Sequence, residues 1–456
     1  MTGAAVATAF DGAKLDRLRQ EVVAQYVEAR PASAEVYERA KESLPGGNSR
    51  HQVYFGPFPF YVADARGPRL RDVDDHCYID LVNNYTSLVH GHAHPDVVAR
   101  ATEQIGRGTA FGAPSALEVD LAAELRQRIR SLDAVRFASS GTEAVYYAIR
   151  TARAFTGRGA VIKAEGGYSG GFDSVQVSVK HLGAVPGQSV PECGVPRVVA
   201  DQTHVIPFND VDTAVEVIRR VGRDCACVVV EPLQGSGGAL PADPSYLAAI
   251  REETAKVGCL LLLDEVQTLR LGYGGMQERY GVEADLTAMG KLIGGGFPIG
   301  AFGGRGDVMA VNDPRRPETP MHAGTYNANP VSLAAGLETL RLLTPEAVSS
   351  LNARGDGLRQ RFNEMARQFG LPMLASGFGS IMQVHTGSQV PRSFREASLR
   401  EKRPVALLFF LLLAEGVFAA PGRCHMNVST VFGDVEAAEL EAALAVAFDR
   451  LASTLA

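Results

Sequence analysis

The most constraining stretch of the sequence is an apolar run that ends abruptly in two acids. Leu260 to Leu263 are four consecutive leucines, and Asp264 and Glu265 follow them directly. Such a run is typical of a strand that is buried on both faces of a parallel sheet. In open α/β sheets, ligands bind beyond the carboxyl ends of the strands. The pattern therefore places Asp264 at a ligand-binding edge.

A single lysine follows in apolar, glycine-rich surroundings. Lys291 is the only charged residue between Met289 and Gly296. These surroundings desolvate an amine and make it more easily neutral and nucleophilic. A buried amine together with a strand-end acid such as Asp264 indicates pyridoxal phosphate chemistry, in which the amine forms an imine with the cofactor and the acid keeps the ring nitrogen protonated. The alternative is an acid in a β-α loop and a lysine on a solvated face.

Composition excludes several other classes of protein. The 456 residues include 45 Lys or Arg and 51 Asp or Glu, for a formal net charge of −6. Without a basic surplus, nucleic acid and anionic membranes are not expected as partners. The most apolar run, 405–414, predicts a buried helix, because it is far shorter than the roughly 20 residues of a membrane span. The N-terminus lacks the pattern of a secretory signal, so we expect a cytoplasmic protein.

Cysteines and histidines show no metal-binding pattern. The six cysteines are scattered and form no CxxC pair, so free thiols in a reducing compartment are expected. The run HGHAHP, from His90 to Pro95, has no acid or cysteine at a matching spacing. It predicts a polar loop that enters a helix at Pro95. We expect no metal site.

A candidate anion site lies in the stretch AVRFASSGTEAVYYAIR. A predicted strand is followed by Ser140, Gly141 and Thr142, and then by apolar residues at helical spacing. The free N–H groups and the dipole of a helix N-terminus bind anions such as phosphate. Ser140 and Glu143 also have the spacing of a capping box, which alone explains both residues. The two roles are compatible.

Four further residues stand at positions that suit a cofactor or a substrate. Glu231 ends a second apolar run, and Tyr168 lies among glycines, where its ring can stack on a planar cofactor. Arg50 follows a flexible Gly-Gly-Asn and offers a two-point grip for a carboxylate, although a surface arginine has the same pattern. Thr325, in HAGTYNANP, is either a hydroxyl donor or a helix cap.

Predicted strands and helices alternate through the middle of the chain. A helical stretch, 244–257, separates the two apolar runs that end in acids, which is typical of βαβ units in a mostly parallel sheet. Before it, a helical stretch at 14–42 precedes an alternating segment that predicts a small antiparallel sheet. After about residue 331, long helices flank short strands. A chain of this length requires more than one core.

Taken together, SSGTEA, DEVQT, the lysine with its glycines and HAGTYNANP resemble the class III aminotransferases of the fold-type I pyridoxal phosphate family. The resemblance covers nearly the whole chain from about Leu44. It is to the branch with β-amino-acid (β-phenylalanine-type) aminotransferases and glutamate-1-semialdehyde 2,1-aminomutase. It implies an α/β fold with a mostly parallel, seven-stranded-type sheet, and pyridoxal 5'-phosphate as the cofactor. The expected parts are an N-terminal segment packing with the small domain (1–85), a large cofactor-binding domain (86–330) and a small α+β domain (331–456).

The resemblance also implies roles for individual residues. Lys291 resembles the lysine that holds the cofactor and moves the proton, and Asp264 the acid at the pyridinium nitrogen. The other matching positions are Ser140, Gly141 and Thr142 for the phosphate, Tyr168 for stacking, Val266 under the ring, Gln267 near its phenolic oxygen, Glu231 close by, and Thr325 for a phosphate contact from the neighbouring subunit. The last match implies a homodimer with shared active sites.

Substrate recognition has weaker matches. Arg50 resembles the arginine with which β-amino-acid aminotransferases grip the substrate carboxylate, and Arg423 lies near a C-terminal arginine used by those enzymes, although in a Pro-Gly-Arg order that shifts the alignment. Ser169 stands where the family often has histidine, which changes the wall of the site. The implied reaction moves an amino group from a β-amino acid to a 2-oxo acid such as 2-oxoglutarate or pyruvate.

Two alternative functions stay open. An aminomutase would move the amine within one molecule and would need no added keto acid. A catalytically silent, cofactor-binding regulator could use the same fold, because fold does not fix function. The intact lysine, acid and phosphate cup favour an enzyme.

Overall fold

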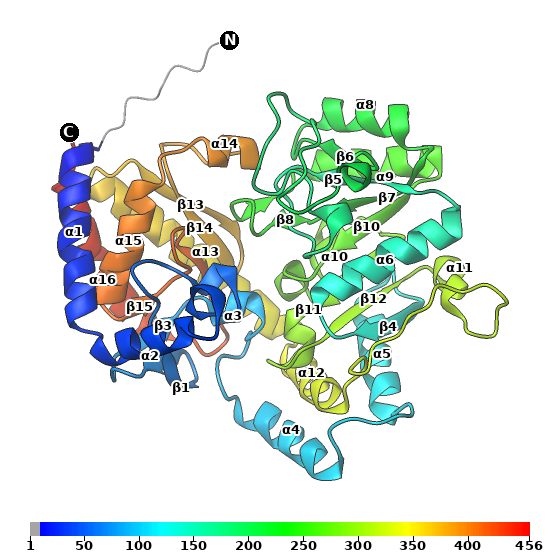
Figure 1. The fold of residues 1–456 in the computed structure, drawn as a ribbon, viewed down its shortest axis with the longest axis horizontal. Coiled ribbons are helices and arrows are strands. Elements are labelled where there is room, and N and C mark those ends of the chain that lie inside the picture. Colours follow the sequence, from blue (N-terminus) through cyan, green and yellow to red (C-terminus); the bar gives the residue numbers. More distant parts are fainter. Residues whose placement is uncertain (1–9) are drawn as a thin grey trace.

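The computed structural model describes residues 10–456, which form two halves (Figure 1). The larger half contains a seven-stranded sheet in the order β4-β12-β11-β10-β7-β5-β6. Only β12 runs antiparallel to its neighbours, β4 and β11. The predicted α/β class with a mostly parallel sheet is therefore confirmed. The strand bounds are β4 (Ala134–Ala138), β5 (Ala160–Ala164), β6 (Thr203–Ile206), β7 (Cys225–Val230), β10 (Leu260–Asp264), β11 (Leu286–Gly290) and β12 (Gly300–Gly304).

The run of leucines forms β10, which lies between β7 and β11. Successive side chains of a strand point to opposite faces, and both faces are covered here. Leu261 and Leu263 pack in a cluster with Leu247 of α9 (Pro244–Val257), whereas Leu262 packs in a cluster with Ile149 of α6 (Gly141–Thr156). Burial on both faces explains why β10 has no polar residue before Asp264.

The remaining helices of the larger half cover the sheet and its lower end (Figure 1). A two-stranded ribbon, β8 (Leu233–Gln234) and β9 (Leu240–Pro241), projects beside the sheet. The helix α12 spans the predicted boundary at 330/331 and packs against α4 and α5. The three-part division stays a prediction. The helix bounds are α4 (Pro95–Arg107), α5 (Ala116–Arg128), α7 (Arg197–Ala200), α8 (Val211–Val221), α10 (Met276–Tyr280), α11 (Gly306–Met309) and α12 (Pro330–Leu342).

The smaller half combines both ends of the chain. The predicted antiparallel sheet is present as β1 (Val62–Arg66), β2 (Arg69–Asp72) and β3 (Cys77–Asp80), and β15 (Val417–Phe418) joins it parallel to β3. A second sheet contains β13 (Met373–Phe378), β14 (Ile381–Thr386) and β16 (His425–Asn427). The helices are α1 (Gly12–Glu28), α2 (Pro31–Lys41), α3 (Asn83–Thr86), α13 (Pro345–Gln368), α14 (Phe394–Ser398), α15 (Arg403–Ala414) and α16 (Asp434–Ala452).

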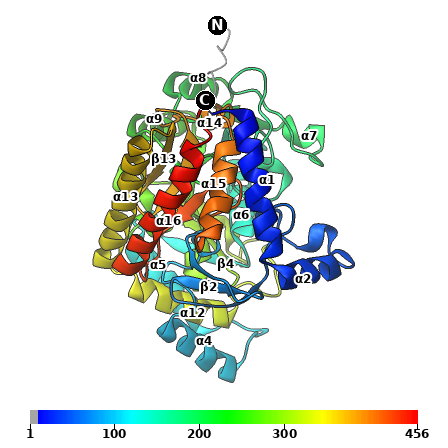
Figure 2. The same cartoon turned by 90° about the vertical axis from the view of Figure 1, so that its left-hand side faces the viewer.

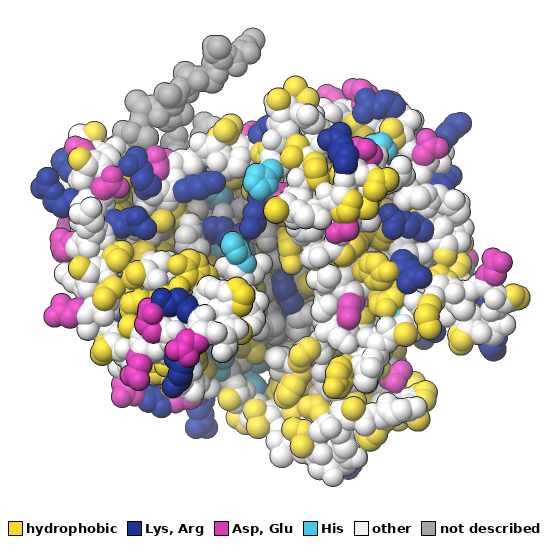
Figure 3. All heavy atoms as spheres, in the orientation of Figure 1, with side chains coloured by type: hydrophobic (Ala, Val, Ile, Leu, Met, Phe, Trp, Pro, Cys, Tyr) yellow, Lys and Arg dark blue, Asp and Glu magenta, His cyan; other side chains and the backbone are white. Residues whose placement is uncertain are grey.

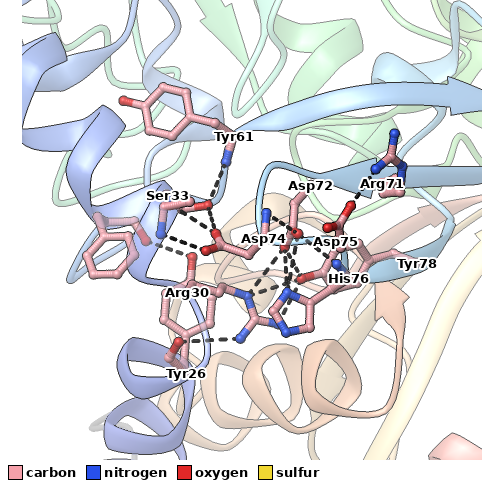
Figure 4. A network of polar contacts seen from close by, with 12 residues as sticks. Tyr26, Arg30, Ser33, Tyr61, Arg71, Asp72, Asp74, Asp75, His76 and Tyr78 are labelled. Atoms are coloured by element: carbon pink, nitrogen blue, oxygen red, sulfur yellow. Dashed lines mark hydrogen bonds and ion pairs between the residues drawn. The ribbon is translucent and has the colours of Figure 1, made fainter.

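The predicted helical stretch 14–42 is two helices, because Pro31 starts a new one. Proline suits the first turn of a helix but interrupts a longer one. The junction is held by a buried network (Figure 4). Arg30 Nη2 donates to the Tyr78 hydroxyl (2.8 Å), which donates to Asp72 (2.6 Å), and Asp74 accepts the Ser33 N–H (2.9 Å). This network fastens the start of α2 to the β2–β3 turn.

The two ends of the described chain meet. Phe10 forms a β-bridge with Leu455. Beside it, α1, α15 and α16 lie next to one another (Figure 2). The run 405–414 is indeed a buried helix within α15. The last helix, α16, ends at Ala452, and Leu455 beyond it pairs with Phe10. No helix within residues 10–456 has the length and apolarity to cross a membrane.

Candidate active site

Two buried acids end neighbouring parallel strands. Asp264 is the last residue of β10, and Glu231 follows β7 directly. The Asp264 carboxylate accepts the N–H of Val266 at 3.1 Å. Burial raises the pKa of Asp264, whereas the Val266 N–H, the Ser169 hydroxyl and the charge of Lys291 oppose that rise. A positively charged partner would therefore keep Asp264 ionised.

Lys291 follows β11 and lies in the left-handed region, with φ of 54°. Its backbone strain is typical of functional positions. Burial lowers the pKa of Lys291 to about 8, against the opposing charges of Asp264 and Glu231. An appreciable fraction of the amine is thus neutral near physiological pH, as a nucleophile requires. The structure brings together Lys291, Asp264 and Glu231, three residues that the sequence analysis had singled out.

Glu231 connects two loops at the sheet edge. Its Oε1 accepts the N–H of Tyr168 (2.9 Å), and its Oε2 accepts the N–H of Gly235 (3.2 Å). Burial and the negative charge of Asp264 raise the pKa of Glu231 to about 8, although both N–H groups oppose the rise. Glu231 therefore fixes the backbone that carries Tyr168.

The expected phosphate cup lies at the start of α6. Ser140 Oγ accepts the N–H of Glu143 at 3.2 Å, as in a capping box, but the Glu143 carboxylate accepts the N–H of Ser139 (2.6 Å). A Cβ on Gly141 would lie 2.9 Å from Cγ1 of Val266, so only glycine leaves this approach free. Thr142 Oγ1 accepts the N–H of Gly171 (3.3 Å). Small residues and hydroxyls thus form a cradle at a helix N-terminus.

Tyr168 and Gln267 complete the surroundings of this cradle. Burial raises the pKa of Tyr168, Thr142 lowers it by a hydrogen bond, and Asp264 raises it further. Tyr168 is therefore close both to Thr142 of the cradle and to Asp264. Gln267 Oε1 is buried and has no hydrogen-bond partner within residues 10–456. A buried polar atom without a partner is expected to face a ligand group. These residues fit a planar, phosphorylated pyridine.

Arg50 and Arg423 are far apart in the sequence, but both lie close to Tyr85. Arg50 Nη1 donates to Asn84 Oδ1 (2.8 Å), and its guanidinium lies 5.3 Å from the centre of the Tyr85 ring. Arg423 Nη1 donates to the carbonyl of Ser236 (3.2 Å). Burial raises the pKa of Tyr85, and the charges of both arginines oppose the rise. The structure thus places two guanidinium groups beside Tyr85.

Tyr85 belongs to a left-handed turn that the sequence analysis missed. In α3, Asn83, Asn84, Tyr85 and Thr86 have φ of 48°, 46°, 55° and 79°. Each such residue costs about 1–2 kcal/mol relative to a right-handed one, least for asparagine. The Tyr85 hydroxyl donates to the carbonyl of Gln52 (2.6 Å), which helps to hold the turn. The paired asparagines were the only local signal.

Arg270 was also missed, and it connects the larger half to this turn and to the rest of the smaller half. It is fully buried in η4 (Thr268–Leu271), and within residues 10–456 no carboxylate forms an ion pair with it. It donates to Ser380 Oγ (3.1 Å) and to the carbonyls of Thr86 (3.5 Å) and Val428. Burial lowers the pKa of Arg270 to about 9. Its charge in turn contributes to the low pKa of Lys291.

Thr325 and the histidine run lie apart from these groups. Thr325 is exposed, and its hydroxyl makes no hydrogen bond within residues 10–456. The histidines serve the fold, since His90 contacts Thr430 Oγ1 (2.9 Å) and His92 contacts Asp80 (2.7 Å), and α4 begins at Pro95 as predicted. In the described part of the chain, no group of three His, Cys, Asp or Glu could hold a metal ion.

The sheet order, the edge lysine and the strand-end acid define the fold-type I class of pyridoxal phosphate enzymes. The model of the family "Aminotransferase class-III" matches residues 52–429, so the chain belongs to this family of aminotransferases. Enzymes of this family use pyridoxal 5'-phosphate, which the cradle fits. Figure 3 shows the face between the halves to be hollowed.

Known proteins of this branch are similar over almost their full length. A β-phenylalanine transaminase of Variovorax paradoxus is 38% identical over 90% of this chain and 91% of its own. A glutamate-1-semialdehyde 2,1-aminomutase of Methanothrix thermoacetophila is 39% identical over 89% of this chain and 93% of its own. The crystal structure of an ω-transaminase from Sphaerobacter thermophilus has a TM-score of 0.90 at 40% identity, covering 93% of this chain and 99% of that one.

Proposed function

We propose that this aminotransferase takes its amino group from a β-amino acid and passes it to a 2-oxo acid such as 2-oxoglutarate or pyruvate. The observation that carries the proposal is the pair of arginines, Arg50 and Arg423, beside Tyr85, of which Arg50 also acts on the pKa of Lys291. Both substrates are carboxylates, and an arginine binds a carboxylate in two-point fashion. The similarity to a β-phenylalanine transaminase supports the choice of donor.

The proposed binding of the cofactor uses the residues of the cradle. Ser140, Gly141 and Thr142 hold the phosphate, and Asp264 holds the protonated ring nitrogen. Tyr168 and Val266 would enclose the ring, and Gln267, whose buried Oε1 has no partner within residues 10–456, would contact the polar group beside it. When bound, the cofactor accepts electron density from the substrate into its protonated ring.

The protein side chains then orient the substrate and move a proton. Arg50 holds the carboxylate and presents the amino-bearing carbon to Lys291. The neutral Lys291 amine would take the proton from that carbon and hold it for return, which its lowered pKa of about 8 permits near neutral pH. Glu231 keeps Tyr168 in place through its N–H. A 2-oxo acid reverses these steps in the second half-reaction.

Attachment to one lysine tests this assignment. After borohydride reduction of the holoenzyme, peptide mapping is expected to find the cofactor on Lys291 and not on Lys163, a second buried lysine whose pKa is also lowered to about 8 by burial. Lys163 donates instead to the carbonyls of Ala164 and Val177 (3.0 and 2.8 Å). Lys291→Ala is expected to lose turnover by about 10³-fold or more. Normal multiple turnover by this variant would contradict the proposal.

An aminomutase is the second candidate, because a glutamate-1-semialdehyde 2,1-aminomutase is 39% identical. The two functions differ in their need for an acceptor. A transaminase given only a β-amino acid stops after one half-reaction, and added 2-oxoglutarate or pyruvate restarts it. Sustained isomerisation of glutamate 1-semialdehyde without a keto acid would favour the aminomutase.

We further propose that two copies form a homodimer with shared sites, in which Thr325 contacts the phosphate bound by the partner. An exposed hydroxyl without a hydrogen bond in its own described chain is free for this contact. A reducing compartment, the cytoplasm, suits the six unpaired thiols.

A further inference from the structure

A segment of the smaller half reaches the loops that carry the proposed cofactor contacts. Residues 392–397, named here the strap, lie between β14 and α15 and include the start of α14. In Figure 1, α14 lies near the junction of the two halves. The strap is distant in sequence from every predicted site residue except Arg423, so no motif pointed to it.

The strap holds the loop before Tyr168 through a buried ion pair. Glu165 directly follows β5, and its side chain is only 3% exposed. Arg395 binds both of its oxygens, with Nη2–Oε1 at 2.5 Å and Nε–Oε2 at 3.2 Å. Within residues 10–456, Arg395 is the only cation at ion-pair distance from Glu165. A bidentate pair of this kind fixes direction as well as distance.

A second contact fixes the next residue of the same loop. Gly166 has φ of +76°, and a Cβ there would lie 2.3 Å from Cβ of Phe394. The strap therefore occupies the space beside Gly166. Two residues later, the N–H of Tyr168 donates to Glu231 of the larger half. The backbone of Glu165 and Gly166 is itself tied to the larger half, since the two N–H groups donate to the carbonyls of Ile206 and Ser178 (2.8 Å each). The strap adds contacts from the smaller half, to the Glu165 side chain and beside Gly166.

We propose that the strap positions Tyr168, so that the placement of the smaller half controls how firmly this ring is held against the cofactor. Arg395 is the main positioning residue, acting through Glu165, and Phe394 supports it at Gly166. The inference rests on the proposed stacking role of Tyr168.

The chain contains no tryptophan, so the fluorescence of one introduced tryptophan reports on its own surroundings alone. In the cofactor-free protein, Tyr168→Trp introduces a single tryptophan on the loop, which can be excited selectively over the remaining tyrosines. Adding Arg395→Gln is expected to raise the acrylamide quenching constant of this fluorophore about twofold, because a loop that loses its anchor opens more often. The matched control is Arg392→Gln, which removes an exposed ion pair with Asp243 from the same strap and is expected to leave quenching unchanged.

A second readout uses the native tyrosine and the cofactor. Arg395→Gln is expected to weaken binding of pyridoxal 5'-phosphate about tenfold, because the lost hydrogen bonds to the charged Glu165 no longer hold the loop of Tyr168 and binding must then order it. Arg395→Lys is expected to recover part of this loss. If Arg395→Gln does not fold, the double variant Glu165→Gln/Arg395→Met removes both charges and is expected to show the same increase in quenching.

A purely structural role would lower the unfolding midpoint but leave both quenching and cofactor affinity as in the parent, and that result would overturn the inference. The quenching experiment needs no cofactor. It therefore stays informative even if the parent protein binds no pyridoxal phosphate, which would refute the proposed function instead.

Discussion

Lys291 combines a left-handed backbone with an amine that is partly neutral. Its φ of 54° lies in the left-handed region, and its amine is close enough to Asp264 and Glu231 for both charges to act on its pKa. Burial lowers the pKa of Lys291 more than these two acids raise it. The Lys291 amine is therefore partly neutral near physiological pH although two carboxylates lie close to it.

The rate of cofactor uptake is expected to report this pKa. When cofactor-free protein is mixed with pyridoxal 5'-phosphate, the rate should rise with pH and level off above about pH 8, because only the neutral amine attacks. An ordinary lysine would keep accelerating to about pH 10.4. Stopped-flow absorbance measures the rate. In Arg50→Gln the curve should move to higher pH, since the charge of Arg50 lowers the pKa of Lys291.

At the level of single residues, local sequence predicted the acids and the lysine but not Arg270. Asp264 and Glu231 end apolar runs, and Lys291 interrupts one, so each is visible in its own neighbourhood. Arg270 resembles any arginine after an apolar stretch. Its partners, Ser380 and Val428, are far along the chain, and only tertiary packing reveals a buried guanidinium without a carboxylate.

Among the elements, the regular strands and helices of the larger half could be predicted from the sequence, whereas the left-handed turn α3 could not. The helix expected at 244–257 has those bounds in α9, because Pro244 starts it and Gly258 ends it in the left-handed conformation. The four left-handed residues of α3 are stabilised by tertiary contacts, such as that of Tyr85 with Gln52, against their intrinsic preference. No local rule predicts a conformation that the surroundings impose.

Two substitutions of Asn84 are expected to separate backbone strain from hydrogen bonding. Asn84→Ala should lower the free energy of unfolding by about 1 kcal/mol, because alanine tolerates the left-handed region less well than asparagine. Asn84→Gly should not, because glycine adopts this region freely. Both variants remove the acceptor for Arg50 and should raise the KM for the carboxylate donor about three- to tenfold.

Chemical denaturation and steady-state kinetics measure the two effects. Equal stability of the alanine and glycine variants would show that the turn is unstrained at Asn84. An unchanged KM in both would show that Asn84 does not orient Arg50.

The whole molecule divides the proposed chemistry between its halves. The larger half supplies Lys291, Asp264 and the phosphate cradle, whereas Arg50 and Arg423 come from segments that pack in or beside the smaller half. The sequence motifs predicted the components of this arrangement. They did not predict the strap, because its contacts join residues with no common pattern.

Mixed dimers are expected to test the proposed sharing of sites. Thr325→Val should weaken cofactor binding about tenfold, the value of a hydrogen bond to a charged phosphate, and Lys291→Ala should be inactive. A hybrid of the two variants contains one site with an intact Lys291 and an intact Thr325 supplied by the partner. It should therefore regain about half of the normal activity at limiting cofactor. Activity no greater than that of the separate variants would exclude a shared site.

The pairing of β3 with β15 has a consequence for how the polypeptide is made. The N-terminal helices and β1–β3 leave the ribosome early, but their partners in α15, β15 and α16 are encoded near the end. At about 5–20 residues per second, the interval is on the order of tens of seconds. During that time the edge of β3 and the apolar side of α1 lack the cover that β15 and α15 provide in the folded chain, so their packing is completed only after those later elements have been made.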